Sequence, residues 1–392
     1  MTGKNDAGST HSRLLEVTRH VKESTRLELV AASGGRCEFL GCNTFLFAHS
    51  VTKTGRYFGN TAHIRAFSPG GPRAGTPEER ADLDLNAIEN LMLLCQECHT
   101  LVDGDEGGYP IEKLRGWKRA HEERATYLLD LPAENEACVF ELWTSLSNQP
   151  VVRSQAKIVA ALLPLYPSKV RSALINLAEH NLSDATLIPA AKDLIDIEVA
   201  RIFGHTGERP THVAVFGLTN IPLLAYLGAK LGDRQDVKLF QLHRDTKDWK
   251  WKDEPASAEY SVENIRAGTS KTSVALLLSL SGTIDPESLP DEIDGRFSIY
   301  EIKLVSDTPN RDFLRTLGDL SRFREVYRKF LSDVQEKHGT LSEIEVIPAV
   351  PIPVAVALGM DRLAKVHPAL QVHDLDRNAG DKPTYQRVLR VP

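Results

Sequence analysis

The sequence predicts a multidomain α/β protein in which a small zinc-containing hairpin-and-helix module precedes open α/β sheets. Two cysteine pairs, Cys37/Cys42 and Cys95/Cys98, have the spacing of a tetrahedral thiolate site. From about residue 204 onward, apolar strand-like runs alternate with helical patterns, and this region contains an internal repeat. With 392 residues, of which 42% are hydrophobic, the chain is long enough for two or three domains.

Composition and proline punctuation divide the chain into three segments. Residues 12–131 hold the cysteine pattern and end in a helix that starts at Pro110, since proline is favoured in the first helical turn. Residues 132–203 begin as a linker and continue as helices interrupted by Pro164 and Pro167. Residues 204–392 alternate strands and helices and form the last domain.

The strands expected in the last segment are short apolar runs bounded by turn residues. They cover 212–216, 237–243, 273–279, 297–304, 343–347, 369–373 and 385–391. The clearest helix covers 311–337, where Phe323, Tyr327 and Phe330 belong to an apolar series with a spacing of three or four residues. Gly339 follows the expected end of this helix, as is common at helix C-termini.

The internal repeat is visible when the C-terminal region is shifted by 131 residues. The shift places residues 213–216 on 344–347, and both copies continue through Ile-Pro into a helix that ends near Leu-Gly. Two such units packed with pseudo-twofold symmetry would bring their post-strand loops together, at the strand ends where ligands of open α/β sheets bind. The alternative is that any two strand-helix units share this pattern.

Charge and hydropathy argue against two classes of protein. The formal net charge of −6 argues against a general polyanion binder. The N-terminus lacks an apolar run, and no run of about eighteen apolar residues occurs, so we expect a cytoplasmic protein without a signal peptide or membrane segment. Cysteines stay reduced in that compartment, and paired cysteines there indicate a metal site rather than disulfides.

The four paired cysteines, Cys37, Cys42, Cys95 and Cys98, are expected to bind one structural Zn²⁺. Such a site is closed, and we assign it no catalytic role. The small module is expected to depend on this metal, because a hairpin and a helix bury too little surface to hold themselves together.

Three further residues suit metal-assisted cleavage of a phosphodiester. His63 is the expected general base, because imidazole titrates near neutrality. His99, directly after the last paired cysteine, is expected to ligate a second, catalytic ion, and Asn90 either orients the imidazole or binds that ion. The second ion must accept phosphate oxygens, which favours Mg²⁺ or Mn²⁺.

A local basic stretch surrounds His63. No Asp or Glu occurs between residues 39 and 77, a segment that contains Lys53, Arg56, Arg65 and Arg73. These cations are candidate contacts for backbone phosphates of DNA. The alternative is a solvated hairpin with a few arginines, because four cations are a weak signal.

Two loops of the C-terminal region are candidate ligand contacts. Lys247, Trp249 and Trp251 interleave cationic and aromatic side chains after a strand, a composition suited to stacking a base and pairing a phosphate. Alternatively, the tryptophans cover a sheet edge. Thr219 and Asn220 could contact a phosphate or a base edge, or only cap the following helix.

The N-terminal motifs resemble an HNH endonuclease of the zinc-containing ββα-metal type. The resemblance covers roughly residues 24–124 and rests on residues 60–64 (Asn-Thr-Ala-His-Ile), residues 90–99 (Asn-Leu-Met-Leu-Leu-Cys-Gln-Glu-Cys-His) and residues 109–118. It implies a metal-dependent DNA endonuclease with His63, Asn90 and His99 as catalytic residues. Ala62 stands where many members of the family carry an Asp or His ligand, so Asn60, Asp103 and water are the expected substitutes.

The C-terminal region is similar to the SAVED sensor domain, a fused pair of CARF-like, Rossmann-like halves. The similarity rests on residues 216–224, 279–282, 299–302 and 348–356, and it would explain the repeat. The ligand-binding residues expected from the loops and from this resemblance together are Thr219, Asn220, Lys247, Trp249, Trp251, Ser279, Ser281, Tyr300, Pro351 and Ile352.

HNH followed by SAVED is the arrangement of an effector nuclease in cyclic-oligonucleotide anti-phage signalling (CBASS). The resemblance implies that a cyclic oligonucleotide, expected to be a cyclic dinucleotide, binds the SAVED domain. Binding would drive formation of a homo-oligomer and switch on degradation of double-stranded DNA. Two other hypotheses remain. The chain is alternatively a restriction endonuclease whose C-terminal domain reads modified DNA, or its zinc module binds DNA without cutting it.

Overall fold

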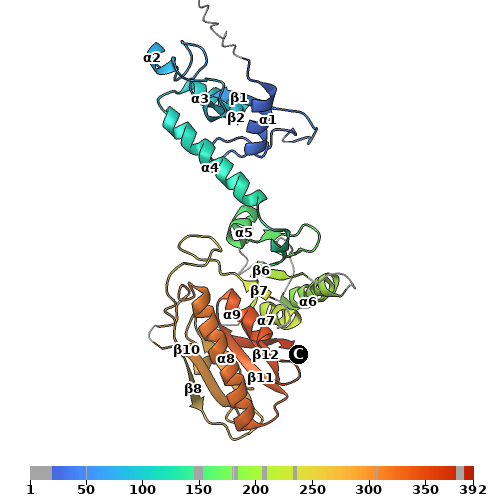
Figure 1. Ribbon diagram of the computed structural model, residues 1–392. Helices are drawn as coiled ribbons and strands as arrows, with labels where there is room; N and C mark the ends of the chain where they lie inside the picture. Colours follow the sequence, from blue (N-terminus) through green and yellow to red (C-terminus); the bar gives the residue numbers. More distant parts are fainter. Residues whose placement is uncertain are drawn as a thin grey trace, which may run out of the picture. The chain divides into compact units, whose positions relative to one another are not determined.

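The computed structural model forms two compact units, Met1–Leu131 and Pro132–Pro392, which are treated separately below (Figure 1). The structure describes residues 20–49, 51–144, 153–178, 180, 184–204, 210–232, 236–305, 308–376 and 384–392. The expected start of the first domain, at residue 12, lies outside the described residues.

The first unit is a two-stranded hairpin surrounded by helices. Its elements in chain order are α1 (Glu23–Ala32), β1 (Gly59–His63), α2 (Pro77–Arg80), η1 (Ile88–Asn90), β2 (Leu91–Cys95), α3 (Gln96–Gly104) and α4 (Ile111–Leu129). β1 and β2 pair antiparallel, with Gly59 opposite Cys95 and His63 opposite Leu91. β2 is buried along most of its length and contributes to a core that also contains Leu29 and Leu114.

The second unit contains two sheets. The five-stranded sheet has the order β4-β3-β6-β7, with β5 also paired to β3, and the six-stranded sheet has the order β13-β12-β11-β9-β10-β8. The strands of the first sheet are β3 (Glu136–Trp143), β4 (Tyr166–Pro167), β5 (Ala173–Asn176), β6 (His212–Leu218) and β7 (Asp236–Leu239). The strands of the second are β8 (Tyr260–Arg266), β9 (Val274–Ser279), β10 (Ser298–Leu304), β11 (Glu343–Ala349), β12 (Ala369–Asp376) and β13 (Thr384–Val391).

Helices cover these sheets. They are η2 (Ala133–Asn135), α5 (Gln155–Leu162), α6 (Asp184–Phe203), α7 (Ile221–Leu231), η3 (Pro286–Ser288), α8 (Leu317–His338) and α9 (Ile352–Met360). α8 crosses one face of the six-stranded sheet (Figure 1), where Phe323 and Tyr327 join the large core shared by both sheets. In the described part of the chain, no helix has the length and apolarity needed to cross a bilayer.

The repeat is present as two matching α/β units. β6 and β11 are displaced from each other by 131 residues at both ends, and α7 and α9 begin at positions related by the same shift. The two helices contact each other through glycines. A Cβ on Gly228 would lie 1.9 Å from the Val356 oxygen, and one on Gly359 would lie 1.9 Å from the Ala225 oxygen. These two contacts are also exchanged by the 131-residue shift, as pseudo-twofold packing requires.

Residues 132–203 are not purely helical, which corrects the prediction. β3 is a buried strand that pairs in parallel with β5 and β6. A short apolar run buried on both faces lacks the alternation that marks a half-exposed strand, so its pattern does not distinguish it from a helix. β8 was missed for the opposite reason, because it is a largely exposed edge strand rich in polar residues.

Two predicted boundaries also move. The helix predicted over 311–337 begins at Leu317, because Thr316 and Asp319 form a capping box at its start. The strand predicted over 237–243 ends at Leu239. Beyond that residue, the Trp251 indole nitrogen donates to the Leu239 oxygen at 2.9 Å, so a side chain satisfies the backbone instead of a neighbouring strand.

Candidate functional site

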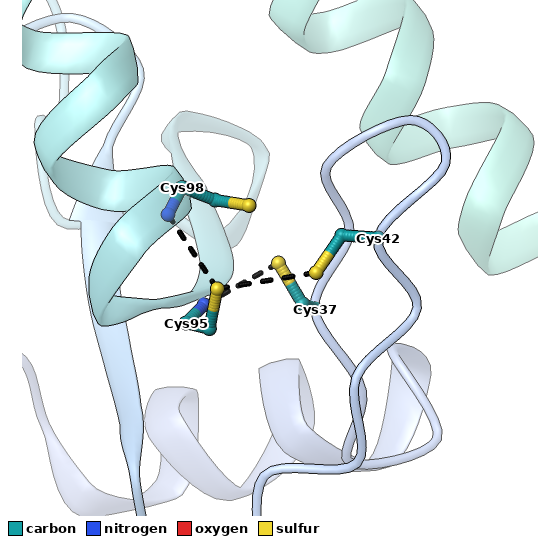
Figure 2. Close-up of side chains that lie close together, drawn as sticks. All are labelled: Cys37, Cys42, Cys95 and Cys98. Carbon is teal, nitrogen blue, oxygen red and sulfur yellow. Dashed lines mark hydrogen bonds between the residues drawn. The ribbon is translucent and has the colours of Figure 1, made fainter. Parts of the chain in front are cut away.

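Four cysteine side chains meet in the first unit. Cys37 and Cys42 lie on a loop, and Cys95 and Cys98 lie at the start of α3 (Figure 2), with all four sulfur atoms within 4.8 Å of one another. The Sγ atoms of Cys42 and Cys95 are 3.9 Å apart. A tetrahedral zinc with bonds of about 2.3 Å would hold its sulfurs about 3.8 Å apart, so the cluster has the dimensions of such a site.

The chain around the cluster favours metal binding. The Cys95 amide donates to the Cys37 sulfur at 3.3 Å, and the Cys98 amide donates to the Cys95 sulfur at 3.5 Å, as amides do around thiolates. Burial raises the pKa of the Cys37 thiol to about 12. A metal would supply the positive charge that deprotonates such a thiol, and its binding would then be coupled to folding of this unit.

His63 is the last residue of β1 and is half-buried. Its Nε2 lies 3.0 Å from the Asn86 Oδ1, and its ring lies 6.0 Å from that of Phe67. With Oδ1 as the acceptor, Nε2 carries the proton and Nδ1 is the basic nitrogen. Asn86 was not among the predicted site residues, because an asparagine in a loop gives no signal of its own.

The Asn90 side chain bonds the backbone and does not bond the His63 imidazole directly. Its Oδ1 accepts from the Arg65 amide at 2.9 Å, and its Nδ2 donates to the carbonyls of Arg65 and Leu85 at 3.0 and 2.9 Å. The buried Asn90 side chain therefore fixes the backbone that follows His63.

His99 and Asp103 lie one turn apart on α3, with His99 Nε2 3.3 Å from an Asp103 oxygen. Arg73 joins this helix to the end of β1, since it donates to Asp103 Oδ1 and to the Ile64 carbonyl, both at 2.8 Å. The end of β1 and the His99–Asp103 pair are thus held next to each other. Asn60, the other expected substitute ligand, bonds instead to Gln96 at 3.2 Å.

Among the described residues, the four cysteines are the only group of three or more His, Cys, Asp or Glu side chains close enough to share a metal ion. His99 and Asp103 supply a nitrogen and an oxygen, which fit a hard divalent ion as a partial ligand set. Such an ion would need water and phosphate oxygens to complete its coordination.

Two of the four predicted DNA contacts are used within the protein. The Arg73 side chain is only 4% exposed and is occupied by backbone oxygens and Asp103. The Arg65 side chain bonds the Ala74 carbonyl and Glu79. A guanidinium has five donors and can bond several backbone carbonyls of neighbouring loops. The sequence alone does not distinguish this structural use of an arginine from phosphate binding. Lys53 and Arg56 are exposed.

In the second unit, polar side chains from both repeats meet after the strands. Thr144 follows β3 and donates to the Thr219 hydroxyl at 3.0 Å. Asn220 makes no side-chain cap on α7, which argues against that alternative; its Nδ2 donates to Asp374 of β12 at 3.0 Å. β12 is the neighbour of β11, which leads into Pro351 at the start of α9. Both repeats therefore contribute polar side chains to one surface at the carboxyl ends of the strands.

Thr144 and Asp374 were not predicted as site residues. Thr144 directly follows β3, the strand whose sequence pattern predicted a helix. Asp374 lies near the end of β12, and only the packing of the two repeats brings it to Asn220. A polar residue at the end of an apolar run was the available signal for Thr144.

The remaining predicted residues near this surface differ in exposure. The Ser281 amide donates to Ala349 of β11 at 2.7 Å, which links the loop after β9 to the segment before Pro351. Ser279 is 1% exposed and bonds Glu301, so its hydroxyl serves the fold. Ile352, at the first turn of α9, packs against the core.

Trp249 and Tyr300 do not form part of the expected binding surface. Trp249 is 3% exposed and packs edge-to-face on Trp143 and Phe216, so the cover interpretation is correct for this ring. The Tyr300 hydroxyl bonds His338 at 2.8 Å. His338 ends α8, the helix that precedes β11, so Tyr300 lies near the start of the strands and away from their carboxyl ends, where the binding surface was expected.

Unlike Trp249, Lys247 and Trp251 are accessible at the surface, as the prediction of a ligand contact requires. Lys247 is exposed, and its carbonyl accepts from Lys157 at 2.6 Å. Trp251 is half-buried beside a cavity of about 490 Å³ that also contacts β7 and the start of α8. One face of the Trp251 ring is therefore open to this cavity while the other packs on the protein, as is common for amphipathic aromatic side chains.

Comparison with known proteins identifies the second unit. A model of the SMODS-associated and fused to various effectors sensor domain (SAVED) matches residues 196–391, half of the chain, which confirms the predicted resemblance of this region. No curated protein matches the chain.

Among solved structures, the chain is similar to the Acinetobacter baumannii Cap4 SAVED/CARF-domain containing receptor with the cyclic trinucleotide 2'3'3'-cAAA. The identity is 14%, the TM-score is 0.42, and the match covers 72% of this chain and 61% of that chain. The same receptor with 3'3'3'-cAAA gives 13% identity, a TM-score of 0.41, and coverages of 75% and 60%. The chain thus spans less than two thirds of the receptor.

Proposed function

The chain belongs to the SAVED family of sensor domains fused to effectors, and on this premise we propose that it is a CBASS effector nuclease. In this proposal, a cyclic oligonucleotide binds the unit Pro132–Pro392 and switches on cleavage of double-stranded DNA by the unit Met1–Leu131. Ligand-driven assembly of copies of the chain would accompany the switch.

The observation that carries the sensor proposal is the contact between Asn220 and Asp374. It joins the start of α7 in one repeat to β12 in the other, at the strand ends where open α/β sheets bind ligands. A ligand with repeated phosphates and bases can engage both repeats at once. Helix N-termini favour phosphate, and the Thr144–Thr219 hydroxyl pair offers donors and acceptors for base edges.

The nuclease proposal is supported by the arrangement around His63. Asn86 holds Nε2, so Nδ1 is available to take a proton from the attacking water. Asn90 and Arg73 hold the chain after β1, which keeps the imidazole in place relative to α3. His99 and Asp103 would hold Mg²⁺ or Mn²⁺, which supplies charge stabilisation for the leaving oxyanion.

A cleavage assay tests this proposal. The purified full chain is mixed with plasmid DNA, Mg²⁺ and a panel of cyclic dinucleotides and cyclic trinucleotides. We expect cutting only with an activating member of the panel. His63→Ala should lower the rate by about a hundredfold or more while it retains zinc and ligand binding.

Two outcomes would replace the proposal. Full cutting without any cyclic nucleotide would favour a restriction endonuclease that reads modified DNA. DNA binding without cutting, by a protein that contains zinc and binds the messenger, would reduce the first unit to a zinc-stabilised DNA-binding module.

A further inference from the structure

The segment between Cys42 and β1 carries exposed aromatic rings that neither zinc binding nor His63 explains. Phe45, Phe47 and Phe58 are 45%, 38% and 41% exposed. The ring centroids of Phe45 and Phe47 are 6.0 Å apart, and those of Phe47 and Tyr57 are 5.1 Å apart. A contiguous apolar surface of this kind on a small unit marks an interaction site.

The rings of Phe45, Tyr57 and Phe58 border a cavity of about 600 Å³, here called the aromatic groove. Its walls combine the rings of Phe45 and Phe58 with the side chains of Asn60, Gln96 and Glu97. Flat rings stack on nucleobases, and amide and carboxylate groups pair with base edges. The groove therefore has the chemistry of a nucleobase site.

The charges around the aromatic groove point the same way. The Arg36 guanidinium carbon lies 5.4 Å from the centroid of the Phe45 ring, and Lys53 and Arg56 are exposed in the segment between Cys42 and β1, which lacks Asp and Glu. These cations suit backbone phosphates. Glu97 disfavours a phosphate inside the groove, so a neutral base is the part of a nucleotide that fits there.

The groove lies at the start of β1 and His63 lies at its end. Asn60 and His63 are three positions apart, about 10 Å along a strand, and this odd separation places their side chains on opposite faces of the hairpin. We propose that the aromatic groove binds one unpaired base of the substrate beside the cleaved phosphate, so that cleavage favours DNA that opens easily beside the cut.

This inference rests on the proposed nuclease function, and its test separates the two. Full-length His63→Ala protein is titrated by fluorescence anisotropy against a short duplex and against the same duplex with a central mismatch bubble. We expect the bubble to bind about tenfold more tightly. Phe58→Ala in the same background should remove that preference while duplex affinity stays within about twofold.

Tyr127→Ala is the matched control, because Tyr127 is 51% exposed on α4 and does not line the groove. It should keep the full preference, and Phe58→Tyr should retain most of it. Zinc content is measured for every variant to show that the unit is folded.

Equal affinity of the His63→Ala protein for both DNAs, or an equal loss on both DNAs in Phe58→Ala, would overturn the groove assignment. If wild-type protein with messenger cuts DNA but shows no preference, only this inference fails. If it neither binds nor cuts DNA, the nuclease function fails as well.

Discussion

Replacing Gly228 by alanine tests the packing that joins the two repeats. The added Cβ would lie 1.9 Å from the Val356 oxygen, whereas an ordinary contact begins at 3.4 Å. To restore an ordinary contact, α7 and α9 must therefore move apart by more than 1 Å. Overpacking of this kind costs about 1–3 kcal/mol, and the backbone carbonyl at the contact cannot rotate away as a side chain does.

Helix propensity predicts the opposite sign. Alanine is favoured over glycine in a helix by about 1 kcal/mol, so an unconstrained helical glycine should gain stability from the substitution. If packing dominates, Gly228→Ala should destabilise the second unit by about 2 kcal/mol, or roughly 4–8 °C in Tm for a unit of this size. Gly116→Ala is the control, since a Cβ there meets no atom within 4 Å, and it should stabilise α4.

Circular dichroism melts and urea titrations of the full chain measure both substitutions. Gly228→Ala should also weaken messenger binding, because α7 carries Asn220 at its start. The double variant Gly228→Ala/Gly359→Ala should cost less than the sum of the single variants, since either methyl separates the same helix pair. A Tm for Gly228→Ala equal to or above the wild-type value would refute the close approach.

Three other expectations follow. Asn86→Leu should lower cleavage about tenfold without loss of zinc. Asn86→Asp should keep activity but move the acidic limb of the pH–rate profile to higher pH, because a carboxylate beside His63 favours the protonated imidazole. Identical pH–rate profiles for Asn86→Asp and the wild type would contradict this role. Cys95→Ser should unfold the first unit and release zinc, and weak chelation should stop cleavage reversibly with zinc retained; an active zinc-free protein would exclude both. Burial opposes ionisation of Asp319, yet amides of Ala258, Thr316 and Ser257 and the Thr316 hydroxyl hold its pKa below the ordinary 3.8. This carboxylate therefore stabilises the fold above pH 3.8, and the stability is lost as the pH falls through the lower folded value. Asp319→Asn should cost about 2 kcal/mol at pH 7, with a gap to wild type that closes at acidic pH in urea titrations; a gap constant with pH would be inconsistent with an ionic role.

Local chemistry and spacing were sufficient for much of this molecule. Thiolates have few structural uses other than metal binding in this pattern, so Cys37 and Cys95 were predicted together, and their sulfurs do meet. The repeat was equally readable, because both copies need the same apolar strand and the same glycine at the helix contact. These features depend on residue type and on separation along the chain, which a sequence contains.

Which polar and aromatic side chains are available to a ligand depends on how the chain packs in three dimensions. Arg73 and Arg56 have the same chemistry, yet one is buried among backbone carbonyls and the other faces water. Trp249 is enclosed by Trp143, a residue of the strand that local pattern assigned to a helix. Asn220 meets Asp374 only because two repeats pack together. Exposure and long-range partners are properties of packing, since the same residue type satisfies its hydrogen bonds with protein, water or ligand according to what surrounds it.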